Sequence, residues 1–125
     1  MYLIDNNIEY KKQYKDNRYC DECGYKFHCD FYLPKYDLFI EIQGNWTHGK
    51  HPFNKNNSED LKIIEQWKSK NSIYYNKAIY NWSISDVKKR EIAHKNGLNF
   101  VECFTKNVDD VINKIITYIE YDKKI

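Results

Sequence analysis

The chain has 125 residues, of which 20 are Lys or Arg and 18 are Asp or Glu, so its formal net charge is +2. Apolar residues make up 42%, which is enough for a hydrophobic core and excludes the compositions typical of disordered chains and of collagen. No apolar run approaches the roughly 20 residues that span a bilayer, and the first residues lack the pattern of a secretory signal. We therefore expect one domain, residues 1–125, in a soluble cytoplasmic protein that does not enter membranes.

Residues 1–19 are polar and rich in tyrosine, and their weak periodicity predicts an arm or a short helix. The next segment, residues 26–33, alternates as a strand does. One predicted face carries Phe27, Cys29, Phe31 and Leu33, and the other carries His28, Asp30 and Tyr32. Pro34 begins a turn, after which residues 37–43 alternate again. Here the apolar face carries Leu38, Ile40 and Ile42, opposite Asp37, Phe39, Glu41 and Gln43. The two segments predict a β-hairpin.

The second half of the chain predicts helices and one more strand. After a loop over residues 44–57, Ser58 is expected to cap a helix that ends near residue 70, while residues 72–84 show no clear pattern. Ser85 is expected to cap a helix over residues 86–95 that Gly97 ends, and residues 98–104 predict a strand. A last helix over residues 107–121 begins at Asn107. This order indicates an α/β (α+β) fold with a central mixed β-sheet flanked by helices.

Four cysteines occur, and without a secretory signal we do not expect them to form disulfides. Cys20 and Cys23 have the two-residue spacing of a zinc knuckle. A structural zinc ion needs four ligands, so His28, Cys29 or Cys103 would have to complete the set. The alternative is a pair of ordinary thiols at a turn.

Two carboxylates are expected to meet on the predicted hairpin. Glu41 and Gln43 share a strand face, and the turn brings Asp30 of the partner strand to the same side. Carboxylate and amide oxygens are ligands that suit Mg²⁺, which can polarise a phosphodiester and lower the pKa of a bound water. The alternative is that Asp30 and Glu41 are solvent-facing residues of a half-exposed sheet.

Two stretches of sequence resemble one family of nucleases. The run from Asp30 through Glu41-Ile-Gln43-Gly44-Asn-Trp-Thr-His48 resembles the core motif of the PD-(D/E)xK, or restriction-endonuclease-like, superfamily. It is most similar to the branch of very-short-patch repair and phage homing endonucleases. A second run, from Trp82 through Asp86-Val-Lys88-Lys89-Arg90 to Gly97, resembles the helix of these nucleases that carries an acid and basic residues. Together the matches place a catalytic core in residues 26–104.

The resemblance implies a role for five residues. Asp30 and Glu41 would bind Mg²⁺ or Mn²⁺, and His48 would act as general base or acid. Gln43 stands where the superfamily usually has a catalytic lysine, and a neutral amide supplies no positive charge to the transition state. Asp86 would join the site from the start of its helix, although an acid in the first turn of a helix is also favoured by the helix dipole alone.

Because the total charge is nearly balanced, contacts to DNA would need locally placed charge. Four residues of the second run, Lys88, Lys89, Arg90 and Lys95, form a basic stripe that could contact phosphates. Trp46 could stack on bases or wedge between them. The alternatives are a solvated helix face and a tryptophan that packs in a small core.

The resemblance therefore predicts a Mg²⁺-dependent DNA endonuclease of the homing or nicking type, encoded by a phage or another mobile element. Two alternatives remain, a DNA-binding module that has lost activity and an interaction protein built on a zinc knuckle at Cys20 and Cys23. A chain of this length has little room for a separate recognition domain, so a long target would require a homodimer or a partner chain. The sequence leaves open whether DNA or RNA is cut.

Overall fold

The computed structural model describes residues 8–122, which fold around a four-stranded sheet. The strands are β1 (Lys11–Tyr14), β2 (Cys29–Leu33), β3 (Leu38–Ile42) and β4 (Asn99–Cys103), and they lie in this order in the sheet. The first three pair in antiparallel fashion, and β4 joins β3 in parallel. The helices are α2 (Ser58–Ser69), α3 (Ile73–Tyr80), α4 (Asp86–Lys95) and α5 (Val108–Thr117). The predicted mixed α/β class with a mixed sheet is confirmed.

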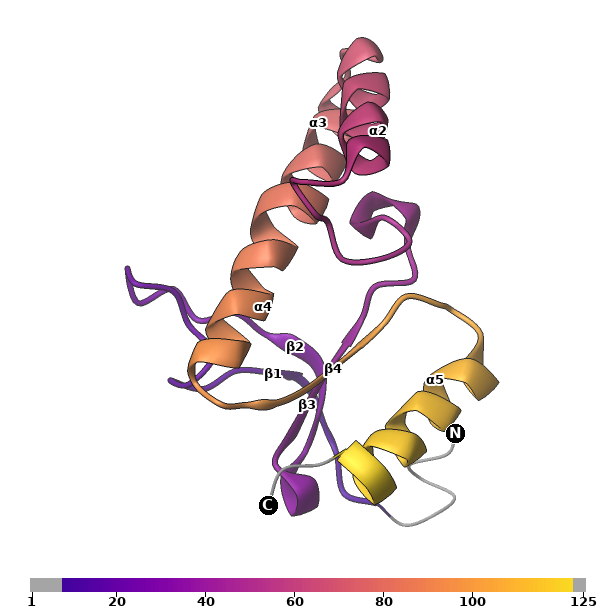
Figure 1. Ribbon diagram of the computed structural model, residues 1–125. Helices are drawn as coiled ribbons and strands as arrows, with labels where there is room; N and C mark the ends of the chain where they lie inside the picture. The colour runs from indigo at the N-terminus through magenta and orange to yellow at the C-terminus, as the bar shows by residue number, and fades with distance from the viewer. Residues whose placement is uncertain (1–7, 123–125) are drawn as a thin grey trace.

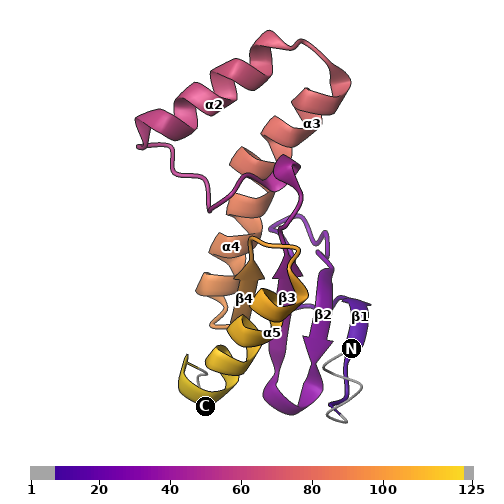
Figure 2. The ribbon, with the colours of Figure 1, turned by 90° about the vertical axis from the view of Figure 1, so that its right-hand side faces the viewer.

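Helices cover both faces of the sheet. Figures 1 and 2 show α5 against one face and α4 along the other. The buried core on the α5 side consists of Leu33, Leu38, Ile40, Val101, Cys103 and Ile115. The buried core on the α4 side consists of Tyr19, Phe27, Cys29, Tyr32, Phe39, Ala93 and Leu98. Since both faces are covered, the alternative of a half-exposed sheet does not hold, and polar residues on either face have to be accommodated inside the protein.

The predicted hairpin is confirmed over β2 and β3, which are joined by a short 3₁₀ helix at Pro34–Tyr36. The predicted alternation fails at its start. Phe27 and Cys29 do not share a core with Phe31 and Leu33 but pack on the α4 side. The reason is that regular β2 structure begins only at Cys29, and Phe27 instead donates a backbone hydrogen bond to Tyr19.

The prediction of an arm or helix at the start of the chain is wrong for residues 8–19. Residues 11–14 form the edge strand β1, whose backbone pairs with β2. The side chains of Lys11, Lys12 and Gln13 are exposed, so no apolar alternation marks the strand in the sequence. Backbone pairing, rather than burial of side chains, defines this element. Residues 1–7 lie outside the described part of the chain.

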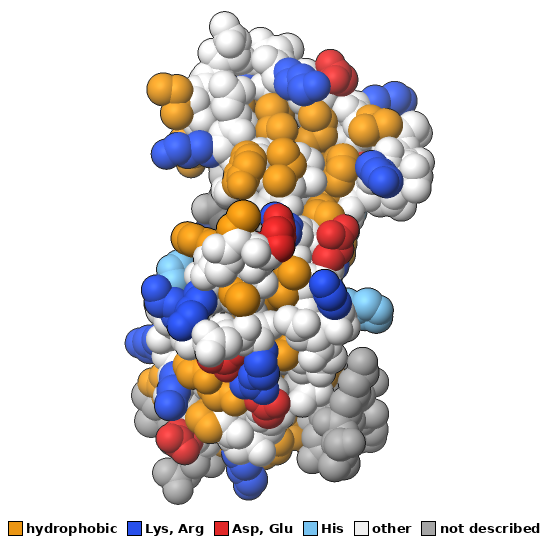
Figure 3. All heavy atoms as spheres, turned by 90° about the vertical axis from the view of Figure 1, so that its left-hand side faces the viewer, with side chains coloured by type: hydrophobic (Ala, Val, Ile, Leu, Met, Phe, Trp, Pro, Cys, Tyr) orange, Lys and Arg blue, Asp and Glu red, His pale blue; other side chains and the backbone are white. Residues whose placement is uncertain are grey.

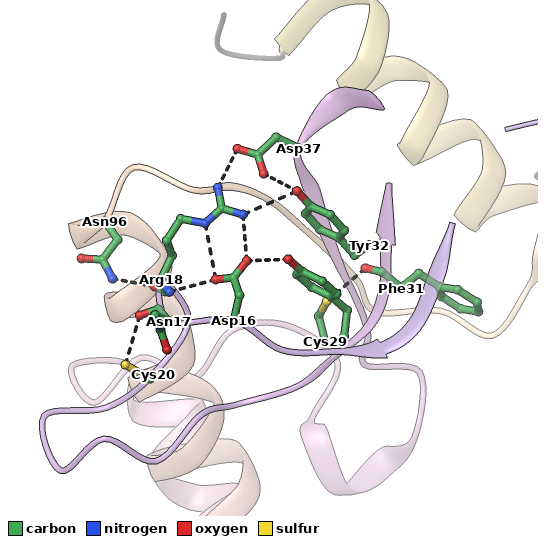
Figure 4. A network of polar contacts seen from close by, with 10 residues as sticks. Asp16, Asn17, Arg18, Cys20, Cys29, Phe31, Tyr32, Asp37 and Asn96 are labelled. Atoms are coloured by element: carbon green, nitrogen blue, oxygen red, sulfur yellow. Dashed lines mark hydrogen bonds and ion pairs between the residues drawn. The ribbon is translucent and has the colours of Figure 1, made fainter. Parts of the chain in front are cut away.

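A polar network fastens the segment after β1 to the β2–β3 turn (Figure 4). The Arg18 guanidinium lies 2.8 Å from a carboxylate oxygen of Asp16 and 2.8 Å from one of Asp37. The Tyr32 hydroxyl donates a 2.6 Å hydrogen bond to Asp37. Burial alone would raise the pKa of Asp37, but the hydrogen bonds from Arg18 and Tyr32 outweigh it and lower that pKa. The network thereby holds the chain that leads from β1 to Tyr19 in place.

Residues 73–95 form one continuous helix, which corrects the predicted start at Ser85. Ser72 caps this helix by accepting a hydrogen bond from the backbone N–H of Tyr75. A π-helical segment, Asn81–Ser85, then leads directly into α4. Ser85 has helical dihedral angles and makes no capping hydrogen bond. Asp86 therefore lies inside a helix rather than at its N-terminus, and the helix dipole does not explain its position.

The other predicted helix ends are confirmed in two cases and shifted in one. Gly97, at a φ of +63°, ends α4, with backbone hydrogen bonds from Gly97 to His94 and from Leu98 to Ala93. Asn107 caps α5 by accepting a hydrogen bond from Asp110. The cap of α2 is Asn57 instead of Ser58, because its carboxamide accepts from two backbone N–H groups of the first turn. No helix among the described residues is long and apolar enough to cross a membrane.

The α2–α3 hairpin extends away from the sheet, as Figures 1 and 2 show, and a tryptophan at its base ties it to the loop before α2. Trp82 is buried, and its indole N–H donates a 2.8 Å hydrogen bond to the backbone carbonyl of His51. Gly49 lies directly against this ring. A Cβ atom at Gly49 would come within 2.4 Å of Trp82, and the residue has a φ of +69°.

We expect Gly49→Ala to reduce the free energy of unfolding by roughly 2–4 kcal/mol, because overpacking against Trp82 adds to the cost of a left-handed alanine. Gly24→Ala is the matched control. Gly24 has a φ of +83° but open space around it, so only the backbone cost of about 1–2 kcal/mol applies. Urea denaturation of both variants measures the difference, and equal losses would show that Trp82 does not constrain the loop.

Candidate functional site

Three acidic residues, Asp30, Glu41 and Glu102, lie at neighbouring positions of the sheet. Across the parallel pair, Glu41 is aligned with Glu102 of β4, and residues at aligned positions of neighbouring strands project to the same side. Asp30 comes directly before the regular pairing of β2 with β3, which begins with Phe31 opposite Ile40. Its negative charge is close enough to raise the pKa of Glu41. Asp30 and Glu41 are therefore near neighbours in the fold.

Glu41 is the most deeply placed of these acids, with only 4% of its surface exposed. The Tyr19 hydroxyl donates a 2.6 Å hydrogen bond to its carboxylate, and the Lys89 ammonium lies 3.5 Å from the same oxygen. Burial raises the pKa of Glu41 to about 7, and the nearby carboxylates of Asp30 and Asp86 add to the rise. Lys89 and Tyr19 act in the opposite direction, so they stabilise the charged form. Glu41 is therefore not a solvent-facing acid.

One face of α4 meets this row of acids. Asp86, Lys89 and Arg90 are separated by three and four positions, which puts them on the same side of the helix. Lys89 reaches Glu41, and Arg90 donates two hydrogen bonds, of 2.5 and 2.7 Å, to the carboxylate of Glu102. Basic side chains of the helix thus face acidic side chains of the sheet across the interface.

Asp86 contacts His48 at the edge of the same cluster. The short 3₁₀ helix Trp46–His48 follows β3. Asn45 caps this helix, because its side-chain oxygen accepts a hydrogen bond from the backbone N–H of Thr47. His48 Nδ1 lies 2.6 Å from a carboxylate oxygen of Asp86, which is itself buried. The hydrogen bond to Asp86 raises the pKa of His48, while partial burial and Lys89 lower it. With Nδ1 held by Asp86, Nε2 is the ring nitrogen available for proton transfer.

Two further residues, Gln43 and Asp30, have hydrogen-bond partners within the chain. Gln43 is buried, and its side-chain amide donates to Glu102 at 3.4 Å rather than to Asp30 or Glu41. Asp30 is half-buried and accepts a 2.6 Å hydrogen bond from the backbone N–H of Ile42. Gln43 is accordingly on the Glu102 side of the cluster, and it is Lys89 that brings positive charge to Glu41.

The donor set fits a hard divalent cation that uses few protein ligands. Asp30, Glu41 and Asp86 bring three carboxylates together, with Lys89 and His48 as their basic neighbours. Among residues 8–122, no three or more His, Cys, Asp or Glu side chains are arranged to hold a metal ion. Mg²⁺ is commonly bound by one or two carboxylates together with waters and substrate phosphates. Asp30 and Glu41 are carboxylates of the type used in that mode of binding.

The two cysteines of the predicted zinc knuckle lie in a tight turn. Cys20 pairs with Lys26 across this turn, and its thiol donates to the Asn17 carbonyl at 3.2 Å. Cys23 is exposed, whereas Cys29 and Cys103 are buried in the cores on opposite faces of the sheet. In the described part of the chain Cys20 and Cys23 therefore offer two ligands, and the structure adds no third.

The predicted DNA-contact residues are divided among different surroundings. Lys88 forms a 2.6 Å ion pair with Glu22, so that with Lys89 and Arg90 three of the four basic residues contact carboxylates of this chain. Lys95 is exposed on the last turn of α4. Trp46 is 40% exposed, and its ring packs against Trp67, Tyr74 and Tyr75.

Sequence reasoning missed Tyr19 altogether and assigned Lys89 only to DNA contacts. No local signal marks Tyr19, since it reaches Glu41 across 22 positions of the chain. The spacing of Lys89 to Asp86 within the predicted helix was a signal that could have placed it on the same side as that acid. A second buried acid, Asp60, was also missed; it pairs with His51 at 2.7 Å and accepts from the backbone of Asn54.

We expect Glu41→Gln to stabilise the protein at alkaline pH. Because the pKa of Glu41 is about 7 in the folded protein and 4.5 ordinarily, wild-type stability falls as the pH rises through this range. The variant lacks this loss, so its advantage should grow from about 1 kcal/mol or less at pH 5 towards an upper limit of about 3 kcal/mol at pH 8. Urea denaturation in EDTA measures it, with Glu91→Gln as a control on the exposed side of α4. An advantage that does not change with pH would contradict the burial argument.

The contact between Asp86 and His48 makes a second prediction. Asp86→Asn removes the carboxylate that raises the pKa of His48, so that pKa should fall. NMR titration of the imidazole resonances measures the change. Asp60→Asn is the matched control, because Asp60 is also buried but contacts His51 instead. A His48 pKa that is the same in wild type and Asp86→Asn would show that the 2.6 Å contact is not maintained in solution.

Comparison with known proteins gave no match: no family model, no curated protein and no solved structure is significantly similar to the chain. The function must therefore be argued from the residues of this chain and the positions they occupy.

Proposed function

We propose that the protein is a metal-dependent DNA endonuclease with a minimal restriction-endonuclease-like fold. The observation that carries the proposal is the proximity of Asp30 and Glu41 on adjacent strands, with Lys89 of α4 beside Glu41. The order of the elements supports it, because an antiparallel hairpin with both acids is followed by a helix and a parallel strand. The homing or nicking type, and a phage or mobile-element source, come from the resemblance alone.

In this proposal Asp30 and Glu41 hold Mg²⁺ or Mn²⁺, which when bound polarises the scissile phosphate and lowers the pKa of a water. Lys89 supplies the positive charge that Gln43 lacks. Its ammonium is 3.5 Å from Glu41 and only partly exposed, so it is positioned to stabilise negative charge that develops on a phosphate at this site. Its place on a helix rather than a strand does not matter, since only the position of the charge acts on the transition state.

His48 is proposed as the general acid. Asp86 orients its ring through Nδ1 and raises its pKa, which favours the protonated form. During hydrolysis the water oxygen forms a bond to phosphorus, and the bond from phosphorus to the leaving oxygen breaks. Nε2 of His48 gives its proton to the leaving oxygen, and the proton of the attacking water passes to solvent. The imidazole then takes up a proton for the next turnover.

A second candidate is a DNA-binding module without activity. The observation that favours it is that Glu41 already has a cation and a hydrogen-bond donor within the chain, Lys89 and Tyr19. A buried ion pair of this kind can be retained for structure alone. An interaction protein with a zinc knuckle has less support, because only Cys20 and Cys23 are available as ligands among the described residues.

Incubation of the purified chain with supercoiled plasmid and Mg²⁺ tests the proposal. We expect Asp30→Asn and Glu41→Gln each to abolish cleavage, and Lys89→Met to slow it by roughly 10²–10³-fold. Lys62→Ala, which removes an exposed lysine of α2, is the control for loss of charge. Mg²⁺ should also raise the melting temperature of wild type more than that of Asp30→Asn.

Cleavage that survives both carboxylate substitutions would refute the metal site. Binding of DNA in EDTA, without cleavage of linear, supercoiled or single-stranded DNA in Mg²⁺ or Mn²⁺, would instead select the inactive module.

A further inference from the structure

A cavity of about 440 Å³ lies between α4 and the hairpin of residues 20–26. Figure 3 shows one face of the molecule, on which hydrophobic and Lys or Arg side chains lie next to one another. The residues that matter for its chemistry are Tyr25, Phe27, His28, Tyr80, Lys88 and Lys89. Its volume lies within the range of sites that bind small molecules or single groups of a larger ligand.

Two tyrosines that line the cavity leave more than half of their surface exposed to solvent. Tyr25 is 62% exposed on the hairpin, and Tyr80 is 56% exposed at the end of α3. Phe27 is buried beneath them, and its ring meets that of Tyr25 edge to face at 5.9 Å. Flat aromatic surfaces that remain accessible in a cavity suit a planar ligand, and a nucleobase is one that stacks on such rings.

The charges around the cavity suit a phosphate beside that base. Lys88, Lys89 and the exposed His28 line it. Asp21 also lines it, but its carboxylate accepts hydrogen bonds from the backbone of Cys23 and Tyr25 at 2.9 Å each. Glu22 pairs with Lys88 at 2.6 Å, and both side chains are solvent-accessible, so a competing phosphate can replace this carboxylate at small cost.

Lys89 connects the cavity to the candidate active site. The same side chain that lines the cavity has its ammonium 3.5 Å from Glu41. A phosphate bound to Lys89 in the cavity would therefore lie on the side of the cavity towards Glu41. A paired base stacked within a duplex cannot enter between the hairpin and α4, whereas an unpaired or flipped base can.

We propose that this cavity binds one unpaired nucleotide of a DNA strand, with its base against Tyr25 and Tyr80 and its phosphate between Lys88 and Lys89. The position of this nucleotide next to the cut rests on the proposed endonuclease function, but binding itself does not. The proposal commits the protein to DNA that contains single-stranded or unpaired nucleotides.

Fluorescence anisotropy with a fluorescein-labelled oligothymidylate in EDTA tests binding without cleavage. We expect Tyr25→Ala and Tyr80→Ala each to weaken binding by roughly 10-fold or more, and Tyr25→Phe to leave it within about 2-fold, because a phenylalanine ring still stacks. Ile73→Ala is the control, since Ile73 is 77% exposed on the same helix as Tyr80 but does not line the cavity. Unchanged affinity in both alanine variants would overturn the proposal.

Substitution of Glu22 distinguishes a phosphate-binding role of Lys88 from a purely structural role of the ion pair between Glu22 and Lys88. Glu22→Gln should tighten binding by roughly 2- to 5-fold, because it frees Lys88 for the phosphate, whereas Lys88→Ala should weaken it. If the contact between Glu22 and Lys88 only held the hairpin against α4, both substitutions would weaken binding alike, and the phosphate position would be wrong.

Unlabelled competitors then test the unpaired base. A hairpin DNA with an unpaired flap should displace the probe, and a blunt duplex of the same length should do so at least 10-fold less well; equal competition would overturn this feature. Loss of binding in the tyrosine variants of a protein that cleaves nothing would support the cavity and refute the endonuclease. If both tyrosine variants bind and cleave as well as the wild-type protein does, the endonuclease is supported and the cavity proposal is refuted.

Discussion

The carboxylate of Glu41, buried between the sheet and α4, is the constraint on which the polar part of the structure depends. Taking an ionised carboxylate out of water costs several kcal/mol unless charges and hydrogen bonds compensate it. Tyr19 and Lys89 provide that compensation, and each comes from a segment that must be held in place to do so. Tyr19 is positioned by the network around Arg18, and Lys89 by the packing of α4 on the sheet. The segment that carries Tyr19 and the helix that carries Lys89 must therefore both be in place for the Glu41 carboxylate to be stabilised.

The continuous helix of residues 73–95 determines which side chains reach the sheet. Trp82, Asp86 and Lys89 recur at four- and three-residue spacing, and they contact the loop, His48 and Glu41 in turn. A break in the helix at Ser85 would let Asp86 rotate independently of Trp82. The π-helical segment Asn81–Ser85 keeps the two parts joined, so the loop that carries His48 and the strand that carries Glu41 are aligned by one rigid element.

The sequence predicted the β2–β3 hairpin because both segments alternate with period two, although the alternation breaks at the start of β2, where Cys29 packs on the α4 side. It could not predict β1, whose side chains are exposed and whose strand exists through backbone pairing with β2. It placed a cap at Ser85 because Ser85-Asp86 looks like a helix start, whereas α4 continues a helix that is capped at Ser72. The role of Lys89 was missed because its partner, Glu41, lies on a strand far away in the chain.

Lys89 belongs to both proposed sites, the metal site and the nucleotide cavity. In the protein alone its ammonium compensates Glu41, at 3.5 Å, and is to that extent unavailable to a phosphate. If Asp30 and Glu41 hold a divalent cation, Glu41 no longer depends on Lys89 for a counter-charge, and the lysine can turn to a phosphate in the neighbouring cavity that it already lines. Metal and DNA would then bind cooperatively without any change in the fold.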